Sequence, residues 1–167
     1  MNSCKAFALG IAAIVGTNVV VPSVATAQTV ADLVGSWAVV SVDNVSPDGK
    51  RSPAFGPNPK GIVMMDAEGR YVELILRSDI PKVAAGNRTQ GTPEENAAVA
   101  QGVLAFYGPY SIAGKVVNLH VDGSSFQNWT EGDQKRTVTT YTKDEITWTN
   151  AAGSSGGLVE LVARRVR

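Results

Sequence analysis

The chain has 167 residues, and its 15 basic and 15 acidic side chains give a formal net charge of +0 at pH 7. This balance excludes the strong basic or acidic character that is typical of proteins bound to nucleic acid or to a membrane surface, so we expect neither partner. Cys4 is the only cysteine. We therefore expect no disulfide, and the fold must be stabilised by packing.

The N-terminus has the pattern of an export signal. Lys5 precedes an apolar run at 6–15, and residues 25–27 have the small-x-small form of a cleavage site. The run is too short and too interrupted to favour a membrane span, although an uncleaved anchor is the alternative. We expect residues 1–27 to be a cleaved signal peptide. Residues 28–167 would then form one exported domain, periplasmic or secreted, that is not stably inserted in a membrane.

Short apolar segments joined by tight turns predict an all-β domain. Residues 33–42 are apolar and β-branched, which indicates a first strand, and we expect Trp37 on this strand to plug one end of a barrel. About eight sequential strands favour an antiparallel barrel or sandwich, because the sheet must close or cover its edges. The remaining strands are expected at 61–66, 70–77, 108–112, 115–121, 134–142, 145–150 and 158–166.

The strand at 70–77 carries two charged residues on one face. Tyr71, Glu73, Ile75 and Arg77 share that face because side chains alternate along a strand. Glu73 and Arg77 could be a buried pair inside the barrel or two residues on a wet surface. We favour the wet surface, because charged side chains are rarely buried.

One helix is expected among the strands. Thr92 can cap it, Pro93 suits its first position and Glu95 completes a capping box, and the helix should run to about Leu104. An inserted helix of this kind suggests a lid or plug at a barrel mouth. The polar segment 122–133 is long for a hairpin link. Our hypothesis is that the helix and this segment together gate an apolar cavity.

The motifs resemble those of a known family. Gly35-Ser36-Trp37 resembles the Gly-x-Trp signature of the lipocalin superfamily, in which an arginine of the last strand packs across the tryptophan. Arg165 lies on the apolar face of the last expected strand and is the natural partner of Trp37. The chain resembles more specifically the lipocalin-like domain family of bacteria and fungi. The matching segments are 34–37, 55–61, 91–95, 120–121, 125–129 and 134–136.

The resemblance implies an eight-stranded antiparallel lipocalin-like β-barrel with one inserted helix near the barrel mouth, and it implies little about activity. In that family we expect a second histidine beside the first and a proline after the phenylalanine of the 125–129 segment. This chain has Leu119 and Gln127 at those positions. The departures make chemistry by a histidine pair doubtful.

Two groups of residues are candidates for chemistry. The only histidine, His120, is a candidate general acid or base, although a structural or solvent-facing role is the favoured interpretation. The second group is formed by Phe126, Asn128, Trp129, Gln134 and Arg136. It offers an aromatic wall, amides and a cation that suits a carboxylate or carbonyl. A folded corner, in which Trp129 packs and Asn128 bonds the backbone, is the alternative for that group. The predicted ligand-binding residues are Tyr110, His120, Asn128, Trp129, Gln134 and Arg136.

We expect a monomer or weak homo-oligomer that binds a small, largely apolar molecule, without a cofactor or metal site. The alternative is an isomerase or cyclase that transfers protons on an apolar substrate with His120 as base. A third interpretation is a structural or interaction module with a filled barrel. A cavity that reaches His120 and a carboxylate would favour the enzyme. The filled barrel would instead be indicated by packing of Trp37, Met64, Met65, Phe106 and Trp148 throughout the interior.

Overall fold

The structure is a computed structural model that describes residues 29–167, so the expected signal peptide lies outside the described residues. Ten strands, two α-helices and two 3-10 turns make up this part of the chain. The helices and turns are α1 (Val30–Leu33), α2 (Pro93–Gly102), η1 (Arg88–Gln90) and η2 (Gln127–Trp129). The strands are β1 (Gly35–Val45), β2 (Arg51–Pro53), β3 (Lys60–Met65), β4 (Arg70–Leu76), β5 (Val103–Ala113), β6 (Val116–His120), β7 (Gly123–Ser124), β8 (Asp133–Tyr141), β9 (Glu145–Asn150) and β10 (Leu158–Arg165).

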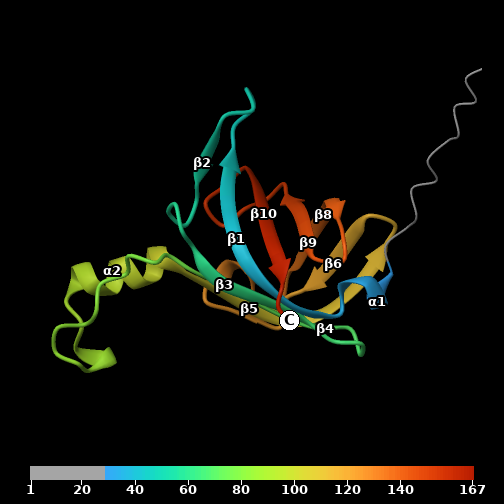
Figure 1. Cartoon of the computed structure of the whole chain (residues 1–167). Coiled ribbons are helices and arrows are strands. Elements are labelled where there is room, and N and C mark those ends of the chain that lie inside the picture. The colour runs from blue at the N-terminus through green and yellow to red at the C-terminus, as the bar shows by residue number, and fades with distance from the viewer. Residues whose placement is uncertain (1–28) are drawn as a thin grey trace, which may run out of the picture.

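Eight of the strands form a closed antiparallel barrel (Figure 1). The order around the barrel is β1-β3-β4-β5-β6-β8-β9-β10, and β10 pairs back with β1. The two remaining strands are short additions, since β2 pairs with the end of β1 and β7 pairs with β5. The prediction of an eight-stranded antiparallel barrel is confirmed. Closure leaves the eight main strands without free edges.

The junction between α2 and β5 differs from the prediction. The helix ends at Gly102 and the strand begins at Val103, whereas we expected a helix to Leu104 and a strand from residue 108. The residues from Val103 to Phe106 pair with β4, and Leu104 and Phe106 are 6% and 2% exposed. Burial in the barrel wall therefore outweighs the helical preference of the alanine-rich segment before them.

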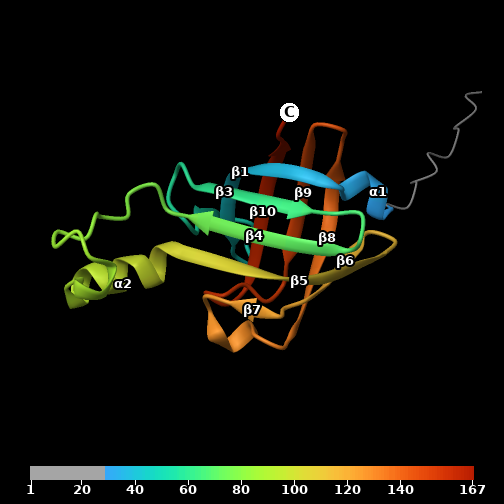
Figure 2. The same cartoon turned by 90° about the horizontal axis from the view of Figure 1, so that it is seen from below.

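The start of α2 is as predicted, but its position is not that of a plug. The Thr92 side chain accepts from the Glu95 N–H and the Glu95 side chain accepts from the Thr92 N–H, so the capping box is confirmed. The helix projects away from the barrel (Figures 1 and 2), and Gly102 is its one buried residue. The inserted helix ends near the barrel mouth as predicted, but it does not cover the mouth, because α2 has no apolar stripe to bury.

A bulge in β1 changes which side chains face the interior. The register with β10 shifts between Val39 and Ser41. Val39 and Val42 are 8% and 2% exposed, whereas Val40 is 39% exposed. An extra residue in one strand breaks the simple alternation of sides. The bulge thus directs both Val39 and Val42 into the barrel.

One end of the barrel is closed by the Gly-x-Trp segment. Trp37 is fully buried, and its indole N–H donates to the Leu33 carbonyl at 2.9 Å. The Arg165 guanidinium lies 3.9 Å from the centre of the Trp37 ring. Gly35 has φ +131, and a Cβ at that position would lie 2.6 Å from Arg165 Nη1. The glycine is therefore required both by its backbone conformation and by the approach of the arginine.

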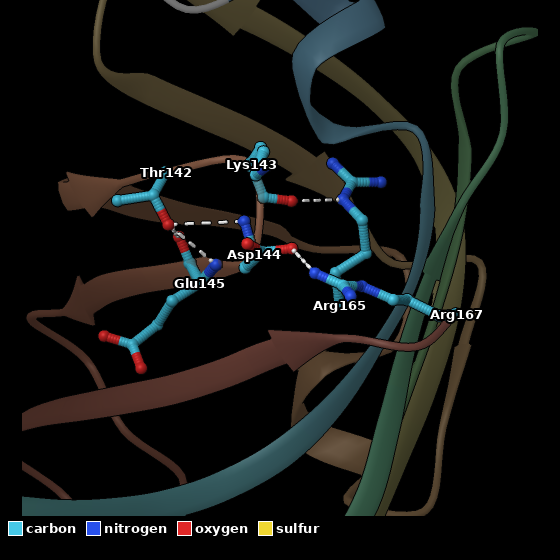
Figure 3. Close-up of polar contacts among 6 residues, drawn as sticks. All are labelled: Thr142, Lys143, Asp144, Glu145, Arg165 and Arg167. Atoms are coloured by element: carbon cyan, nitrogen blue, oxygen red, sulfur yellow. Dashed lines mark hydrogen bonds and ion pairs between the residues drawn. The ribbon is translucent and has the colours of Figure 1, made fainter.

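Three backbone carbonyls hold Arg165 in place. Its Nη1 donates to Val34 at 2.7 Å, its Nη2 to Asp32 at 2.9 Å, and its Nε to Lys143 at 2.7 Å. Figure 3 shows the last of these contacts at the turn between β8 and β9, where Arg167 also donates to Asp144. The guanidinium ties the last strand to α1 and to this turn. We call this end of the barrel the closed end.

Candidate ligand-binding site

A cavity occupies the opposite end of the barrel, which we call the open end. It contains about 410 Å³ of space between atoms, including the part that opens to solvent. The enclosed part is far smaller, because the centre of a water-sized molecule can occupy only about 40 Å³ of it. Strands β1, β4, β5, β8, β9 and β10 all contribute to it. Its apolar walls include Val42, Ile75, Leu104, Trp129, Trp148 and Leu161.

Two oppositely charged side chains face this apolar cavity. Glu73 on β4 and Arg136 on β8 both line it, and each is only 3% exposed. No carboxyl oxygen of Glu73 lies within 4.0 Å of a guanidinium nitrogen of Arg136. A buried charge without a direct partner is costly. Two buried, oppositely charged side chains that do not pair directly are the least expected feature of the barrel interior.

The guanidinium of Arg136 is held by aromatic rings rather than by strong acceptors. Its Cζ lies 5.6 Å from the centre of the Phe106 ring and 5.7 Å from that of Trp129. Nη1 donates to Gln134 Oε1 at 3.5 Å and to the Lys135 carbonyl at 3.3 Å, and both contacts are long. An arginine has five N–H donors. Nε and Nη2 donate to none of the described residues, so most of the hydrogen-bonding capacity remains.

Glu73 has even fewer partners, since its carboxyl group makes no hydrogen bond with any residue in the described part of the chain. In that part, Thr130 Oγ1 is the only fully buried side-chain N or O atom without a partner. The unpaired polar atoms of Glu73 and Arg136 must therefore keep some contact with open space. Because both residues line the cavity, that space is the cavity itself.

Burial shifts the protonation equilibria of both groups. Desolvation raises the pKa of Glu73, and the positive charge of Arg136 partly opposes the rise. Desolvation also lowers the pKa of Arg136, while the negative charge of Glu73 opposes that change. Nearby, burial and the charge of Glu73 raise the pKa of Tyr71. The raised pKa means that the carboxylate form of Glu73 binds a proton more readily than an exposed carboxylate does.

The loop between β7 and β8 forms one wall of the cavity. Trp129 is 8% exposed and makes edge contacts with Phe106 and Phe126 at ring distances of 5.2 Å and 5.9 Å. The loop is also pinned to β5, because the Ser125 N–H donates to the Ala105 carbonyl at 2.7 Å. This segment is an ordered part of the barrel wall.

A groove adjoins the cavity at the rim. It contains about 850 Å³ between atoms, including open solvent, and it shares Phe55, Leu104 and Ser155 with the cavity. Ala100 and Gln101, at the end of α2, line its outer side. The helix therefore borders the approach to the cavity through its last residues only.

The predicted ligand-binding residues are not all in one place. Trp129 and Arg136 line the cavity, and Gln134 contacts Arg136 from the same strand. Tyr110 is buried at the closed end, where its hydroxyl donates to the Asp66 carbonyl at 2.8 Å. Asn128 is exposed on the loop.

His120 lies outside the barrel. Its side chain is 47% exposed, and Nδ1 lies 2.9 Å from the Asp133 carboxylate on the neighbouring strand. On β6, Val117 and Leu119 face the interior, so alternation directs His120 outward. The favoured solvent-facing interpretation of His120 agrees with this position. His120 does not line the open-end cavity, but together with Tyr110 and Gln134 it lines a separate hollow on the outer surface, so its roles as candidate base and ligand contact stay predictions.

Glu73 is the important residue that sequence reasoning missed. We favoured a wet surface for it, and this is wrong, because the side chain is buried inside the barrel. Its neighbours on the same face of β4, Tyr71 and Ile75, are each 2% exposed. These two flanking residues were the available signal. Arg77, the partner that we considered, instead pairs with Asp79 on the surface.

The barrel is filled at one end and hollow at the other. Trp37, Met65 and Phe106 are 0%, 5% and 2% exposed, while Met64 is 47% exposed and lies outside. Trp148 is buried but lines the cavity. Packing is therefore complete at the closed end, while a small space remains among the side chains of the open end. The cavity reaches a carboxyl group, as the enzyme alternative required, but that group is Glu73 and the cavity does not reach His120.

Two further features of residues 29–167 concern metals and membranes. This part of the chain contains no group of three or more histidine, cysteine, aspartate or glutamate side chains placed to hold a metal ion. Within the same range, no helix has the length and apolar character needed to cross a bilayer.

A closed antiparallel barrel with one plugged end and a lined cavity at the other belongs to the class of cup-shaped barrels that hold small ligands. Residues 34–165 match the sequence profile of the family described as "Lipocalin-like domain". The chain belongs to this family. The resemblance seen in the sequence is confirmed, and the fold is consistent with binding a small molecule. A comparison with curated proteins gives no match.

Two solved structures of redesigned β-barrels are similar to the chain. The first, b11L5F_LGL, has 11% identity and a TM-score of 0.45, and the match covers 86% of this chain and 99% of that chain. The second, mFAP1 bound to DFHBI, has 15% identity and a TM-score of 0.43, with 82% and 98% covered.

Proposed function

We propose that this protein binds one small, largely apolar molecule in the open-end cavity, with the polar end of the ligand between Glu73 and Arg136. The proposal rests on one observation. Two buried, oppositely charged side chains face an apolar cavity, and they form no ion pair or hydrogen bond with each other. Such groups are costly to bury unless something completes their hydrogen bonds. A ligand with an oxygen at one end supplies an acceptor for Arg136.

The walls of the cavity suit the remainder of such a ligand. Trp129 and Trp148 offer flat aromatic faces, and Val42, Ile75 and Leu161 add aliphatic surface. Small-molecule sites commonly combine a mainly apolar lining with a few polar groups that fix the orientation. The apolar body supplies most of the binding free energy, and the polar pair selects the ligand.

A titration with the neutral apolar dye N-phenylnaphthylamine tests the proposal. Binding should enhance the dye emission and quench the emission of Trp129 and Trp148. Val42→Phe would fill the cavity from β1 and should weaken binding at least about tenfold, which is roughly 1.4 kcal/mol. Val40→Phe is the matched control, because it is the same change on the same strand and points to solvent.

The two variants separate an interior site from a surface site. Unaltered dye affinity in folded Val42→Phe protein, or no dye binding by the unmodified protein, would refute the proposal. Circular dichroism establishes that both variants retain the barrel.

We also propose that the mature protein is exported. Lys5, the apolar run at 6–15 and the small residues at 25–27 support this proposal. Protein recovered from outside the cytoplasm should have Gln28 as its first residue. A chain that still begins at Met1 would refute cleavage.

A further inference from the structure

We propose that the open-end cavity also catalyses proton transfer at a carbon next to a carbonyl group of its ligand, with Glu73 as the base and Arg136 holding the carbonyl oxygen. This inference rests on the proposed function, because the ligand must first occupy the cavity. It assigns the proton transfer to a residue of the barrel interior, whereas His120 lies on the outer surface.

The geometry places the two groups on different sides of one cavity. Glu73 projects from β4 and Arg136 from β8, and β5 and β6 lie between these strands in the sheet. Both side chains line the same space, and they do not form an ion pair with each other. The proposal places the reacting part of the ligand between them. A carbonyl and its neighbouring C–H bond present an acceptor to one side and a proton to the other.

The surroundings suit each group to its role. The apolar walls disfavour the charged carboxylate and raise the pKa of Glu73, which makes the carboxylate a stronger base than one in water. Arg136 is the cation that acts on Glu73, and it has N–H groups to spare. Tyr71, on the same face of β4, is the other titratable group near the pair, and its hydroxyl donates to the His120 carbonyl at 3.3 Å.

The step conserves atoms and electrons. A Glu73 oxygen takes the proton from the carbon, and the C–H electron pair becomes a carbon–carbon double bond. The π electrons of the carbonyl move to its oxygen, and the resulting enolate accepts hydrogen bonds from Arg136. Protonated Glu73 then returns the proton to the same carbon or to one further along a conjugated chain. The second outcome moves a double bond, which is an isomerisation, and no oxidant or reductant is consumed.

Hydrogen–deuterium exchange of β-tetralone in heavy water tests this inference. The probe is an apolar bicyclic ketone with acidic C–H bonds next to its carbonyl. The full chain should accelerate the loss of the corresponding proton signals above the rate in buffer, as measured by NMR. Glu73→Gln should reduce the acceleration by about a hundredfold while probe binding, measured by tryptophan quenching, is retained. Glu68→Gln, in the exposed turn between β3 and β4, is the matched control and should exchange at the unmodified rate.

The outcomes separate proton transfer from binding. Binding of β-tetralone without acceleration over buffer overturns the proton transfer and leaves the ligand-binding proposal in place. Equal acceleration by Glu73→Gln and unmodified protein overturns the role of Glu73. Failure to bind both β-tetralone and N-phenylnaphthylamine overturns the inference together with the proposed function.

Discussion

The two ends of the barrel each place an arginine against a tryptophan, but the two arginines have very different partners. At the closed end, Arg165 lies over Trp37 and donates to three backbone carbonyls at 2.7 to 2.9 Å. At the open end, Arg136 lies beside Trp129, and its side chain makes only two hydrogen bonds with the described residues, at 3.3 and 3.5 Å. The N–H donors of the arginine are thus satisfied at the closed end and mostly without partners among the described residues at the open end.

This difference separates a structural arginine from the arginine that we propose to bind the ligand. A guanidinium whose donors are met by the backbone joins segments of the chain, and here it joins β10 to α1 and to the turn between β8 and β9. A guanidinium whose donors face a cavity has affinity left for a ligand. The nearest opposite charge, on Glu73, does not remove this affinity, because the two groups are not in contact. Substitutions at the two ends should therefore have opposite consequences for stability and binding.

The largest expected effect is at the closed end. Trp37→Ala should lower the free energy of unfolding by roughly 3–5 kcal/mol, the usual cost of removing a large buried aromatic side chain. Arg165→Ala should cost less. The double variant should cost less than the sum of the two changes, because the groups are in contact. Chemical denaturation of all four proteins measures this coupling, and strict additivity would show that the stacking contributes no free energy.

The opposite result is expected at the open end. Replacing Glu73 and Arg136 together by methionine should leave the free energy of unfolding unchanged or raise it by about 1–4 kcal/mol, because two poorly paired buried charges are removed. Chemical denaturation measures the effect. Arg136→Met alone is informative as a control, because it leaves Glu73 without its opposing charge. A large loss of stability in the double variant would mean that the charged pair stabilises the fold.

A smaller effect depends on pH. Because the folded-state pKa of Glu73 is raised, the folded protein binds more protons than the unfolded chain above the ordinary carboxyl pKa of 4.5. Stability is therefore lost as the pH rises through the raised pKa, by about 1.4 kcal/mol for each pKa unit of the shift. Glu73→Gln cannot ionise, so its thermal midpoint should increase relative to the unmodified protein as the pH is raised. Parallel pH curves for the two proteins would contradict the raised pKa.

The smallest effect concerns a single hydrogen bond at the closed end. The Tyr141 hydroxyl donates to the Asp32 carbonyl at 2.8 Å, and its ring makes an edge contact with Trp37. Tyr141→Phe keeps the ring and removes the hydroxyl, so it should cost about 0.5–1.5 kcal/mol. Thermal denaturation checks the value, and dye binding at the open end should not change. A change in dye affinity would mean that the two ends are coupled.

Much of the fold could be predicted from local patterns. Alternation and turn residues locate the strands, and Gly35-Ser36-Trp37 with a terminal arginine indicates the closed end. The start of β5 and the bulge near Val40 could not be predicted in this way. Both depend on pairing with strands that are distant in the sequence, and the local residues prefer helix or simple alternation.

The candidate site was harder to predict than the fold. Trp129 stands out in the polar segment 122–133, because an aromatic residue there indicates packing, and Arg136 follows on the next expected strand. The sequence favours a surface position for Glu73, because burial of a lone carboxylate is generally unfavourable. Its position between two inward-facing apolar residues indicated the interior. The rule that charged side chains stay on the surface therefore fails at this position.

A comparison of β-tetralone with tetralin tests most directly whether Arg136 binds a ligand oxygen. The two molecules share an apolar body, and only the first has a carbonyl. We predict that the unmodified protein prefers β-tetralone by at least about tenfold, roughly 1.4 kcal/mol, and that Arg136→Met loses the preference while still binding tetralin. Arg88→Met, at an exposed position before α2, should keep the preference. Equal affinity of the unmodified protein for the two molecules, or an unchanged preference in Arg136→Met, would contradict the account.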